Sequence, residues 1–383
     1  IISFHKWPTD SKYPYGKCEH IIGSIGIYEN ECDVLLYKHN LIFPRFKIHK
    51  SIITEHQTLN SNINKSDYNV FSIDPDDCKD IDDAISFTSY DKYIEIGVHI
   101  TDVSYYINDL QHLLKNLTTS VYCLHKQINM IPDVYATDIC SLLENNYRKC
   151  ISVIYHFSHD YKLLDYEIKL TNVYIIKNLS YDNAELYIKN KDKDYQYLVD
   201  LWNFMTQYDT SVTDTHILIE KLMVLTNHKI ASTLYNYDKN NTLLRIHPSP
   251  SIINTLDNKI TDNKLQEFLK LKNYHAAIYE KNVITPYHYG LDLNIYTHFT
   301  SPIRRLSDII THINIKKYLE KLPLLDTKNT EISHINEVNK STKKLSFDYK
   351  IIDLLYKFKT VSMYKCEAYI IDFTKNKFTI YIP

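Results

Sequence analysis

Several features that would assign this chain to a common class of protein are absent from its sequence. No run of about 18 apolar residues, the length that a membrane-spanning helix needs, is present. The seven cysteines form no CxxC pair, so we expect free thiols in a reducing compartment and neither a disulfide framework nor a zinc knuckle. Glycine is scarce, with 5 residues against 34 tyrosines, a bias typical of AT-rich coding sequence. These absences indicate a soluble intracellular protein, cytoplasmic or nuclear, with no membrane partner.

A basic excess, the usual mark of a protein that binds along a phosphate backbone, is also missing. The 44 lysines and arginines are balanced by 46 aspartates and glutamates, which gives a formal net charge of -2. A site that gathers carboxylates around metal ions would make the sum negative even if a groove elsewhere were basic. The overall charge therefore neither supports nor excludes nucleic acid as a partner.

The pattern of apolar residues predicts an α+β protein. The length of 383 residues allows two to three domains, or one large domain with small attachments. Residues 1–50 alternate short apolar runs, such as HIIGSIGIY and CDVLLY, with breaks, which predicts small strands of a partial β-barrel. From Phe71 to Ile107 the pattern is strand, acidic loop, strand, strand, and two further strand-like runs lie in 150–180.

Helices are predicted where apolar residues recur at intervals of three and four. This spacing is found in residues 183–231, 304–320 and 339–359. The final run CEAYIIDFTKNKFTIYIP reads as a β-hairpin that turns near Lys375 and Asn376.

The most informative segment is DPDDCKDIDD, which begins at Asp74 and places six carboxylates in ten residues directly after a predicted strand. Like charges this close raise one another's pKa unless cations neutralise them, and oxygen ligands favour Mg²⁺ or Mn²⁺ over zinc. A solvated acidic loop explains the run equally well when it is taken alone. A calcium loop of the EF-hand type does not fit, because its glycine and glutamate positions hold Lys79 and Ile85.

Two other segments carry residues that suit a phosphate substrate. HFTSPIRRLSD places Arg304 and Arg305 after a Ser-Pro break at the predicted start of a helix, and arginines and helix N-termini both attract phosphate. Glu220 lies within the apolar pattern of a predicted helix. Two adjacent arginines are more often surface charges, and an acid in a helix is usually exposed, so neither segment is decisive by itself.

Taken together and in order, seven segments resemble the RNB catalytic domain of the RNase II, RNase R and exosome-catalytic-subunit family, in its eukaryotic-type form. They cover about residues 70–348 and are DPDDCKDIDDAISF, GVHITDVSYYI, SVYCLHKQINMIPDVYATDICSLLENNYR, IEKLMVLTN, LLRIHPSPS, YHYGL and THFTSPIRRLSDIITH. So many colinear matches are hard to obtain by chance.

The resemblance implies an RNB catalytic domain over residues 51–360, with a mixed β-sheet core and packed long helices. It also implies partial OB-like β-barrels on either side. Residues 1–50 resemble the tail of a cold-shock barrel, and residues 361–383 resemble the start of an S1 barrel.

The resemblance further implies a 3′-to-5′ exoribonuclease that hydrolyses single-stranded RNA to 5′-mononucleotides with Mg²⁺, or with Mn²⁺ as an alternative. Its catalytic core would act as a monomer, and an exosome-like complex is an implied partner. The matching metal positions are Asp74, Asp80, Asp82 and Asp83, with Asp82 also a catalytic residue. The other matches are Arg304, Tyr181 and Glu220 at the reacting end, and Tyr122, Arg148 and Arg305 as RNA contacts.

The sequence also departs from the family pattern. Leu306 replaces the usual tyrosine after the arginine pair, Ile313 replaces an arginine, and Tyr147 replaces an aspartate. None of these is a predicted metal ligand, so the hydrolytic set is complete. Two alternatives stay open, namely an inactive RNB-fold protein that binds RNA as a scaffold, and a nuclease that acts on DNA with similar metal chemistry.

Overall fold

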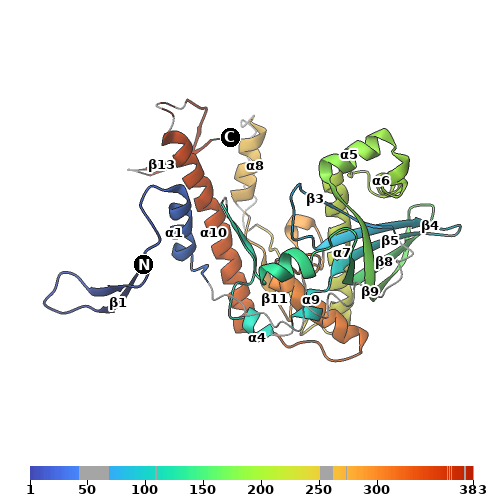
Figure 1. The fold of residues 1–383 in the computed structure, drawn as a ribbon, viewed down its shortest axis with the longest axis horizontal. Helices are drawn as coiled ribbons and strands as arrows, with labels where there is room; N and C mark the ends of the chain where they lie inside the picture. The colour runs from blue at the N-terminus through green and yellow to red at the C-terminus, as the bar shows by residue number, and fades with distance from the viewer. Residues whose placement is uncertain are drawn as a thin grey trace.

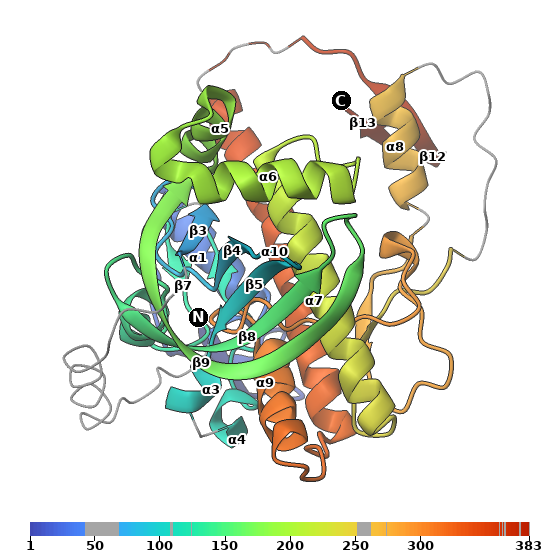
Figure 2. The same ribbon diagram turned by 90° about the vertical axis from the view of Figure 1, so that its right-hand side faces the viewer.

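A closed five-stranded β-barrel forms the centre of the computed structural model (Figures 1 and 2). The structure describes residues 1–42, 69–107, 110–123, 125–250, 262–272, 274–359, 361, 363, 365–374 and 377–382. The barrel consists of β3 (Val70–Asp74), β4 (Asp83–Ser89), β5 (Ile94–Thr101), β8 (Tyr147–Phe157) and β9 (Leu163–Ser180).

One pair of neighbouring barrel strands is parallel and the others are antiparallel. β3 runs parallel to β9, with Asp74 opposite Ser180, and the β3–β4, β4–β5, β5–β8 and β8–β9 pairs are antiparallel. The predicted mixed β core is therefore confirmed. Because β3 and β9 run in the same direction, the acidic loop at the end of β3 lies beside the start of the helix that follows β9.

Successive side chains of a β-strand point to opposite faces of the sheet. Every residue of β5 is buried, so this strand buries side chains on both faces. On β5, Ile94, Ile96, Val98 and Ile100 belong to the large apolar cluster that also includes helices α6 (Gln196–Tyr208) and α7 (Thr215–Tyr237). Figure 2 shows α6 above the barrel and α7 running alongside it. These helices cover the apolar core of the barrel. The polar residues of the acidic loop begin at Asp74, where β3 ends.

The alternate face of the same strands holds a buried polar chain centred on His99. The His99 ring contacts the Ser86 hydroxyl at 2.9 Å and the Ser152 hydroxyl at 2.7 Å. A Cβ atom at Gly97 would lie 2.4 Å from the Ser86 oxygen and 2.5 Å from His99 Nε2, so this close approach requires glycine. Burial lowers the pKa of His99 from its ordinary value of 6.5 to about 4, because the charged ring would lose its hydration.

The lowered pKa predicts that His99 makes folding less stable in acid. Between pH 6.5 and pH 4 the unfolded state binds a proton at this site that the native state does not, so stability falls as the pH is lowered. We expect this group alone to reduce the free energy of unfolding by about 2 kcal/mol between pH 7.5 and pH 5. Urea unfolding of the wild type and of His99→Gln at both pH values measures it. An equal pH-dependent loss in the two proteins would contradict the prediction.

The long helices on the other side of the site are α9 (Leu306–Leu319) and α10 (Asn329–Lys359). The predicted helices at 183–231, 304–320 and 339–359 are all found, although α10 begins ten residues earlier than expected. The remaining elements between β5 and α10 are short. They are α3 (Val103–Tyr106), α4 (Leu110–Leu113), β6 (Val121–Tyr122), β7 (Gln127–Ile128), a π-helix (Tyr135–Ile139), α5 (Tyr181–Asn190), 3₁₀ turns (Lys193–Tyr195, Tyr289–Leu291), β10 (Leu244–Ile246), α8 (Asn263–Lys272) and β11 (Ile278–Glu280).

The N-terminal segment differs from the prediction. It begins with the hairpin of β1 (Ile2–Lys6) and β2 (Tyr15–Cys18), but the run CDVLLY lies in helix α1 (Tyr28–Lys38) and not in a strand. Buried Cys32, Leu35 and Leu36 have the spacing of one helix face, and Figure 1 shows α1 beside α10. A six-residue apolar run is too short to separate the two periods, so packing against α10 decides the outcome.

The predicted C-terminal hairpin is present as β12 (Tyr369–Thr374) paired with β13 (Lys377–Tyr381). Its expected turn residues, Lys375 and Asn376, lie outside the described residues. The hairpin contacts α8 through the stacked rings of Tyr381 and Phe268, whose centroids are 4.5 Å apart. Whether the segments at 1–50 and 361–383 are parts of separate barrels stays a prediction.

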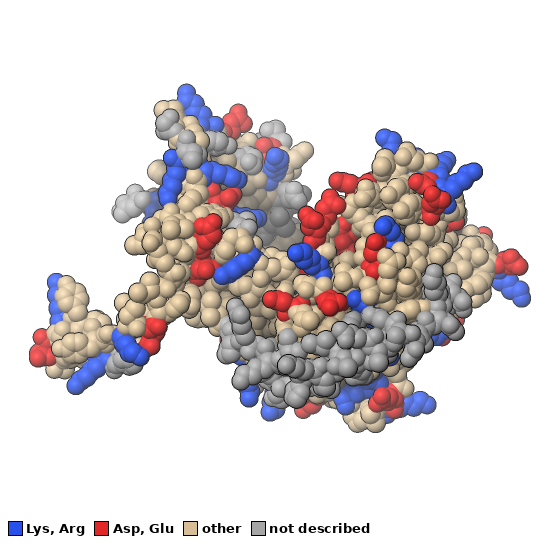
Figure 3. Space-filling model, in the orientation of Figure 1, with Lys and Arg blue, Asp and Glu red and all other residues tan. Residues whose placement is uncertain are grey.

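The face drawn in Figure 3 is hollowed between the part with α8 and α10 and the part with α5 and the barrel. Basic and acidic side chains both occur along this hollow. Within the described residues, no helix combines the length and the apolar character that crossing a bilayer demands.

Candidate active site

The acidic loop joins the end of β3 to the start of β4. Asp74 is the last residue of β3 and Asp83 is the first residue of β4, so the barrel fixes both ends of the loop. The middle is also anchored, because the buried Ile81 N–H donates to the Ser141 hydroxyl at 3.0 Å. The carboxylates on either side of Ile81 are thereby held against the rest of the site.

Burial makes the carboxyl groups of Asp74 and Asp83 difficult to ionise. It raises the pKa of Asp74 to about 6, assisted by the charge of Asp80 and opposed by a hydrogen bond with Ser72. It raises the pKa of Asp83 well above the usual value, and the charges of Asp74 and Asp82 add to the effect. The Oδ2 atom of Asp74 is buried and has no hydrogen-bond partner. A positive charge near these groups would stabilise their ionised forms.

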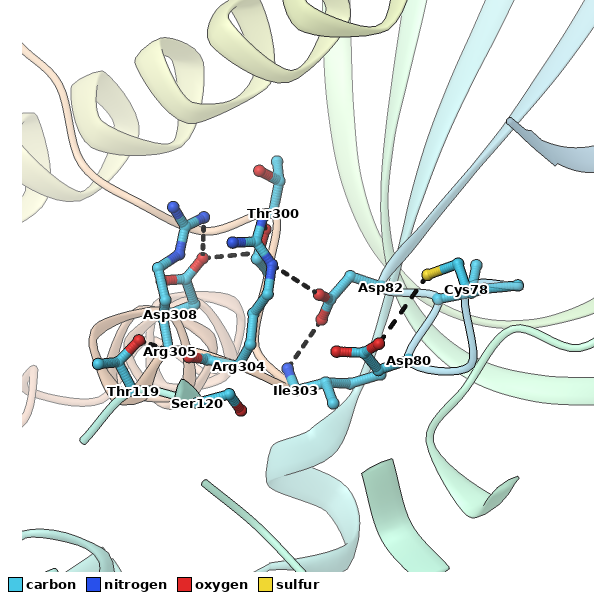
Figure 4. A network of polar contacts seen from close by, with 12 residues as sticks. Cys78, Asp80, Asp82, Thr119, Ser120, Thr300, Ile303, Arg304, Arg305 and Asp308 are labelled. Atoms are coloured by element: carbon cyan, nitrogen blue, oxygen red, sulfur yellow. Dashed lines mark hydrogen bonds and ion pairs between the residues drawn. The ribbon is translucent and has the colours of Figure 1, made fainter. Parts of the chain in front are cut away.

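Asp82 meets a second segment, residues 300–308, that is far away in the sequence (Figure 4). One Asp82 oxygen accepts from the Ile303 N–H at 2.8 Å, and the other lies 3.5 Å from Arg304 Nε. Burial raises the pKa of Asp82 to about 7, although Arg304 and the Ile303 N–H both oppose the shift. The Arg304 side chain stays 43% exposed and can therefore reach a ligand while it contacts Asp82.

Asp80 points to a different partner. The Tyr122 hydroxyl donates to Asp80 Oδ2 at 2.8 Å, and the Gln127 amide donates to the same oxygen at 3.0 Å. Both donors come from the small β6–β7 hairpin. Tyr122 is 50% exposed, so its ring is accessible at the edge of the acidic loop.

The chain just before this hairpin is bound to the arginine segment. Ser120 N–H and the Thr119 hydroxyl both donate to the Arg304 carbonyl at 3.0 Å, and Leu306 N–H donates to the Thr118 carbonyl at 3.0 Å. Three segments therefore meet here, namely the acidic loop, the 118–128 strand pair and residues 300–308.

Tyr181 and Glu220 lie on the helical side of the loop. Tyr181 is the first residue of α5, next to Ser180, which pairs with Asp74. Burial raises the pKa of Tyr181 to about 12, and the charges of Asp83 and Asp74 contribute. Its ring packs on His216 with centroids 3.7 Å apart. Glu220 is exposed one helical turn beyond His216 on α7, so it shares a helix face with that ring, but no contact joins it to the aspartates.

Arg305 and Arg148 are less available than the sequence suggested. Arg305 donates to the fully buried Asp308 at 2.9 Å. Arg148 is only 2% exposed, and its guanidinium donates to the carbonyls of Ser141, Tyr147 and Asp138 at 2.7, 3.0 and 3.1 Å. The RNA contact of Arg148 stays a prediction, and in this structure its buried side chain is committed to backbone oxygens. It holds the Ser141 segment that anchors Ile81.

We expect Arg148→Met to lower the free energy of unfolding by about 2–4 kcal/mol, because buried carbonyl oxygens lose their donors. The RNA dissociation constant of the folded fraction should stay unchanged. Urea unfolding and RNA binding measure the two effects. Lys149→Met, on the same strand and with the same loss of charge, is the matched control and should cost less than about 1 kcal/mol. Weaker RNA binding by Arg148→Met at unchanged stability would support the predicted contact.

The donor chemistry of the acidic loop fits Mg²⁺. Carboxylate oxygens are the ligands this ion prefers, and the unpartnered Asp74 oxygen and the raised pKa values of Asp74 and Asp83 fit a nearby cation. Their orientations are not those of a closed site, because Asp80 and Asp82 each face a protein donor. In the part of the chain that is described, no three His, Cys, Asp or Glu side chains are grouped to hold a metal ion.

Sequence reasoning missed several residues of this site. Gln127 carried no signal, since an amide opposite a distant aspartate has no local pattern. His216 is likewise recognisable only from its contact with Tyr181. Asp308 stood within the quoted HFTSPIRRLSD segment, three residues after Arg305 on the same helix start, and that spacing could have identified the pair.

Family models and curated relatives match this chain. The model of the RNB domain matches residues 63–207 and 199–321, and the model of the Dis3-like cold-shock domain 2 matches residues 1–40. The exosome complex exonuclease RRP44 of Mus musculus is 25% identical over 473 aligned residues, which cover 100% of this chain and 49% of that protein. Ribonuclease R of Thermotoga maritima is 25% identical over 403 residues, covering 84% and 56%. The chain thus spans about half the length of these curated relatives.

Solved structures share the fold. RNase R of Mycoplasma genitalium, in complex with ribose methylated single-stranded RNA, superposes with a TM-score of 0.79 at 17% identity, covering 100% of this chain and 72% of that one. Yeast Ssd1, a pseudonuclease, gives a TM-score of 0.72 at 19% identity, covering 92% and 54%. The same fold therefore occurs in both a nuclease and a pseudonuclease. Because the RNB model matches most of the sequence, from residue 63 to residue 321, the chain belongs to the RNB domain family.

Proposed function

We propose that the chain is the catalytic part of a 3′-to-5′ exoribonuclease that hydrolyses single-stranded RNA to 5′-mononucleotides. The observation that carries the proposal is the contact of Asp82 with Arg304, 3.5 Å apart, where the acidic loop meets residues 300–308. A buried carboxylate with one oxygen facing a half-exposed guanidinium places a possible metal ligand beside a group that can bind a phosphate oxygen. Family membership adds support, since curated relatives are named exonucleases.

Asp74, Asp80, Asp82 and Asp83 would hold Mg²⁺, with Mn²⁺ as the alternative. When bound, such ions lower the pKa of a water molecule and stabilise the leaving oxygen of the phosphodiester. Burial raises the pKa of Asp74, Asp82 and Asp83. A bound cation would stabilise their ionised forms more strongly here than in water.

Arg304 would stabilise the negative charge that develops on the phosphoryl oxygens. Its guanidinium is held by Asp82 and by a 3.0 Å hydrogen bond to the Ser301 hydroxyl, so it is oriented before substrate arrives. Preorganised donors of this kind are the main source of charge stabilisation in such reactions. Ser301 accepts from Arg304 and is buried, which suits a positioning role and not that of a nucleophile.

Single strands would be selected by stacking. Tyr122 is half-exposed beside Asp80, and Tyr181 lies beside Asp74, so aromatic rings flank the loop on two sides. Each base stacked on an aromatic ring contributes roughly 1–3 kcal/mol without regard to sequence. Glu220 is a candidate for contact with the 2′-hydroxyl that distinguishes RNA from DNA. Arg305 would contact the RNA only through the part of its guanidinium that Asp308 leaves free.

An inactive RNA-binding scaffold is the second candidate. It is favoured by the orientation of Asp80 and Asp82 toward protein donors and by the likeness of the fold to a pseudonuclease. The complete set of four aspartates and Arg304 favours the enzyme.

The test is an incubation of 5′-labelled RNA and DNA oligomers with the purified chain, in Mg²⁺ or in EDTA. Stepwise shortening of RNA from the 3′ end, with release of mononucleotides only in Mg²⁺, is the expected outcome. Binding of RNA without shortening would establish the scaffold, and equal degradation of DNA would establish a DNA-directed nuclease. We propose in addition that the core acts as a monomer inside the cell and that an exosome-like complex is a partner. Gel filtration and co-purification measure these two properties.

A further inference from the structure

Two sequence segments that the proposed chemistry leaves unused meet beside the active site. LLRIHPSPS supplies β10, and its Arg245 pairs across the sheet with Tyr279 of β11. His247 of the same segment lies beside His288 of YHYGL, with ring centroids 5.1 Å apart. The cluster of Arg245, Tyr279, His247, His288 and His298 is called the β10 cluster below.

Arg245 is a buried cation whose guanidinium has an unused hydrogen-bond donor. Its side chain lies 4.4 Å above the Tyr279 ring, the residue is 9% exposed, and its Nη1 atom is buried without a hydrogen-bond partner. No carboxylate among the described residues forms an ion pair with it. The ring contact offsets part of the desolvation cost, but an unpaired buried guanidinium is still unfavourable. An anion would supply the missing acceptor.

Apart from Asp308, the described charged and titratable groups around Arg245 are positive or neutral. Lys343 of α10 has a pKa lowered by burial and by the charge of Arg245, and it has no ion pair within the described part of the chain. Burial, with the charges of Arg305 and Arg245, holds the pKa of His298 well below its usual value. The buried His247 Nε2 and His288 Nδ1 atoms also have no partners. This excess of unused donors favours a ligand with several acceptor oxygens.

The nearest acid cannot neutralise the cluster. Asp308 is fully buried and already accepts from Ser301 N–H, Arg305 and the Ser307 hydroxyl. The oxygen of the Ser307 hydroxyl also lies 2.7 Å from the Tyr279 hydroxyl, within hydrogen-bond distance. The β10 cluster is therefore joined through Ser307 and Asp308 to the segment that carries Arg304. Figure 1 draws β11 between α10 and α9, and β11 packs against α10.

We propose that Arg245 and Lys343 bind a phosphate group of the RNA backbone upstream of the scissile one, with Arg305 nearby. This inference rests on the proposed function. An enzyme that removes the terminal nucleotide has one reacting phosphate, which Arg304 meets, so any other phosphate held by the chain lies on the 5′ side. The Arg245 Nη1 atom and the Lys343 ammonium donate to its oxygens, and the neutral imidazoles provide further donors.

The first test measures RNA binding in EDTA, where nothing is cleaved, by fluorescence anisotropy over a range of about 50 to 200 mM KCl. Lys343→Met and Arg245→Gln should each weaken binding and reduce the slope of log K against log salt by about 0.7, the value for one phosphate contact with a single strand. Lys344→Met, at the adjacent lysine of α10, which is also exposed, is the matched control and should leave the slope unchanged. Arg245→Lys should restore part of it.

The second test locates the contact. Oligomers with a single neutral methylphosphonate are compared, one linkage at a time. The wild-type protein should bind more weakly to the oligomer in which one particular upstream linkage is neutral. The dissociation constant of Lys343→Met should not change when the same linkage is made neutral. The proposal is overturned if both variants have the salt slope and the linkage profile of the wild type. If Arg245→Gln then differs only in a lower unfolding midpoint, the role of Arg245 is structural.

The remaining outcomes separate this site from the catalytic proposal. If inorganic phosphate raises the melting temperature of the wild type but not of Lys343→Met, while RNA binding is unaffected, the site holds free phosphate and the RNA assignment fails. If the linkage profile is as expected but Mg²⁺ produces no shortening, the phosphate site stands and the exonuclease proposal fails. Absence of RNA binding by the wild type defeats both.

Discussion

Replacing Asp82 with asparagine should reduce RNA hydrolysis by at least about 10³-fold, while binding of the same oligomer changes little. Asparagine keeps the oxygen that accepts from the Ile303 N–H and the shape that packs beside Arg304. It removes the negative charge, and with it the ability to hold a divalent cation against a phosphate. Single-turnover kinetics in Mg²⁺ and anisotropy in EDTA measure the two effects separately.

The matched control is Asp77→Asn, on the same loop. Asp77 is exposed and has a left-handed backbone, with φ of 61°, which asparagine adopts as readily as aspartate. The charge change is identical and the side chain faces solvent, so we expect nearly full activity. Normal turnover by Asp82→Asn would falsify the catalytic assignment of the loop.

Arg304→Met should lower kcat by about 10²–10³-fold, or roughly 3–4 kcal/mol of transition-state stabilisation. The reason is that the guanidinium, held by Asp82 and Ser301, would interact with charge that grows during the reaction. KM should change much less, because the ground-state phosphate is contacted elsewhere as well. Steady-state rates over a range of RNA concentrations separate the two constants.

Arg304→Lys is the informative companion variant. It keeps the charge but loses the planar donors, so its rate should lie between those of the wild type and Arg304→Met. Added guanidinium ion should partly rescue Arg304→Met and not the wild type. A rise in KM with unchanged kcat would instead make Arg304 a binding residue only.

The strands around the acidic loop could be predicted because short apolar runs there are bounded by charged breaks. Helix α1 could not be, since CDVLLY satisfies both periods, and only its contact with α10 selects the helix. The early start of α10 has a related cause. Its first turns hold Ile332 and Ile335, which are buried against the 103–139 region, and this contact is not visible from local spacing.

The resemblance to the family predicted which residues belong to the site. Their contacts with one another are visible only in the structure. Asp82 and the Ile303 N–H that it contacts are 221 residues apart, so no spacing argument could pair them. Arg148 shows that a charged residue in a functional segment can instead have a structural role. The sequence marks it as a charged residue in a functional segment, but the carbonyls that surround it make it a support for the acidic loop.

One short segment, residues 118–120, is called the ribbon here. It is bonded to the backbone of Arg304 and Leu306 and directly precedes Tyr122 in the chain. Its bonds to the carbonyl of Arg304 and to Leu306 N–H lie directly before Tyr122. Any local opening that frees the ribbon would displace Arg304 and Tyr122 in the same event. The site is thus assembled or dismantled as one cooperative unit, and the amides of Ser120 and Leu306 should exchange with deuterium at a common rate.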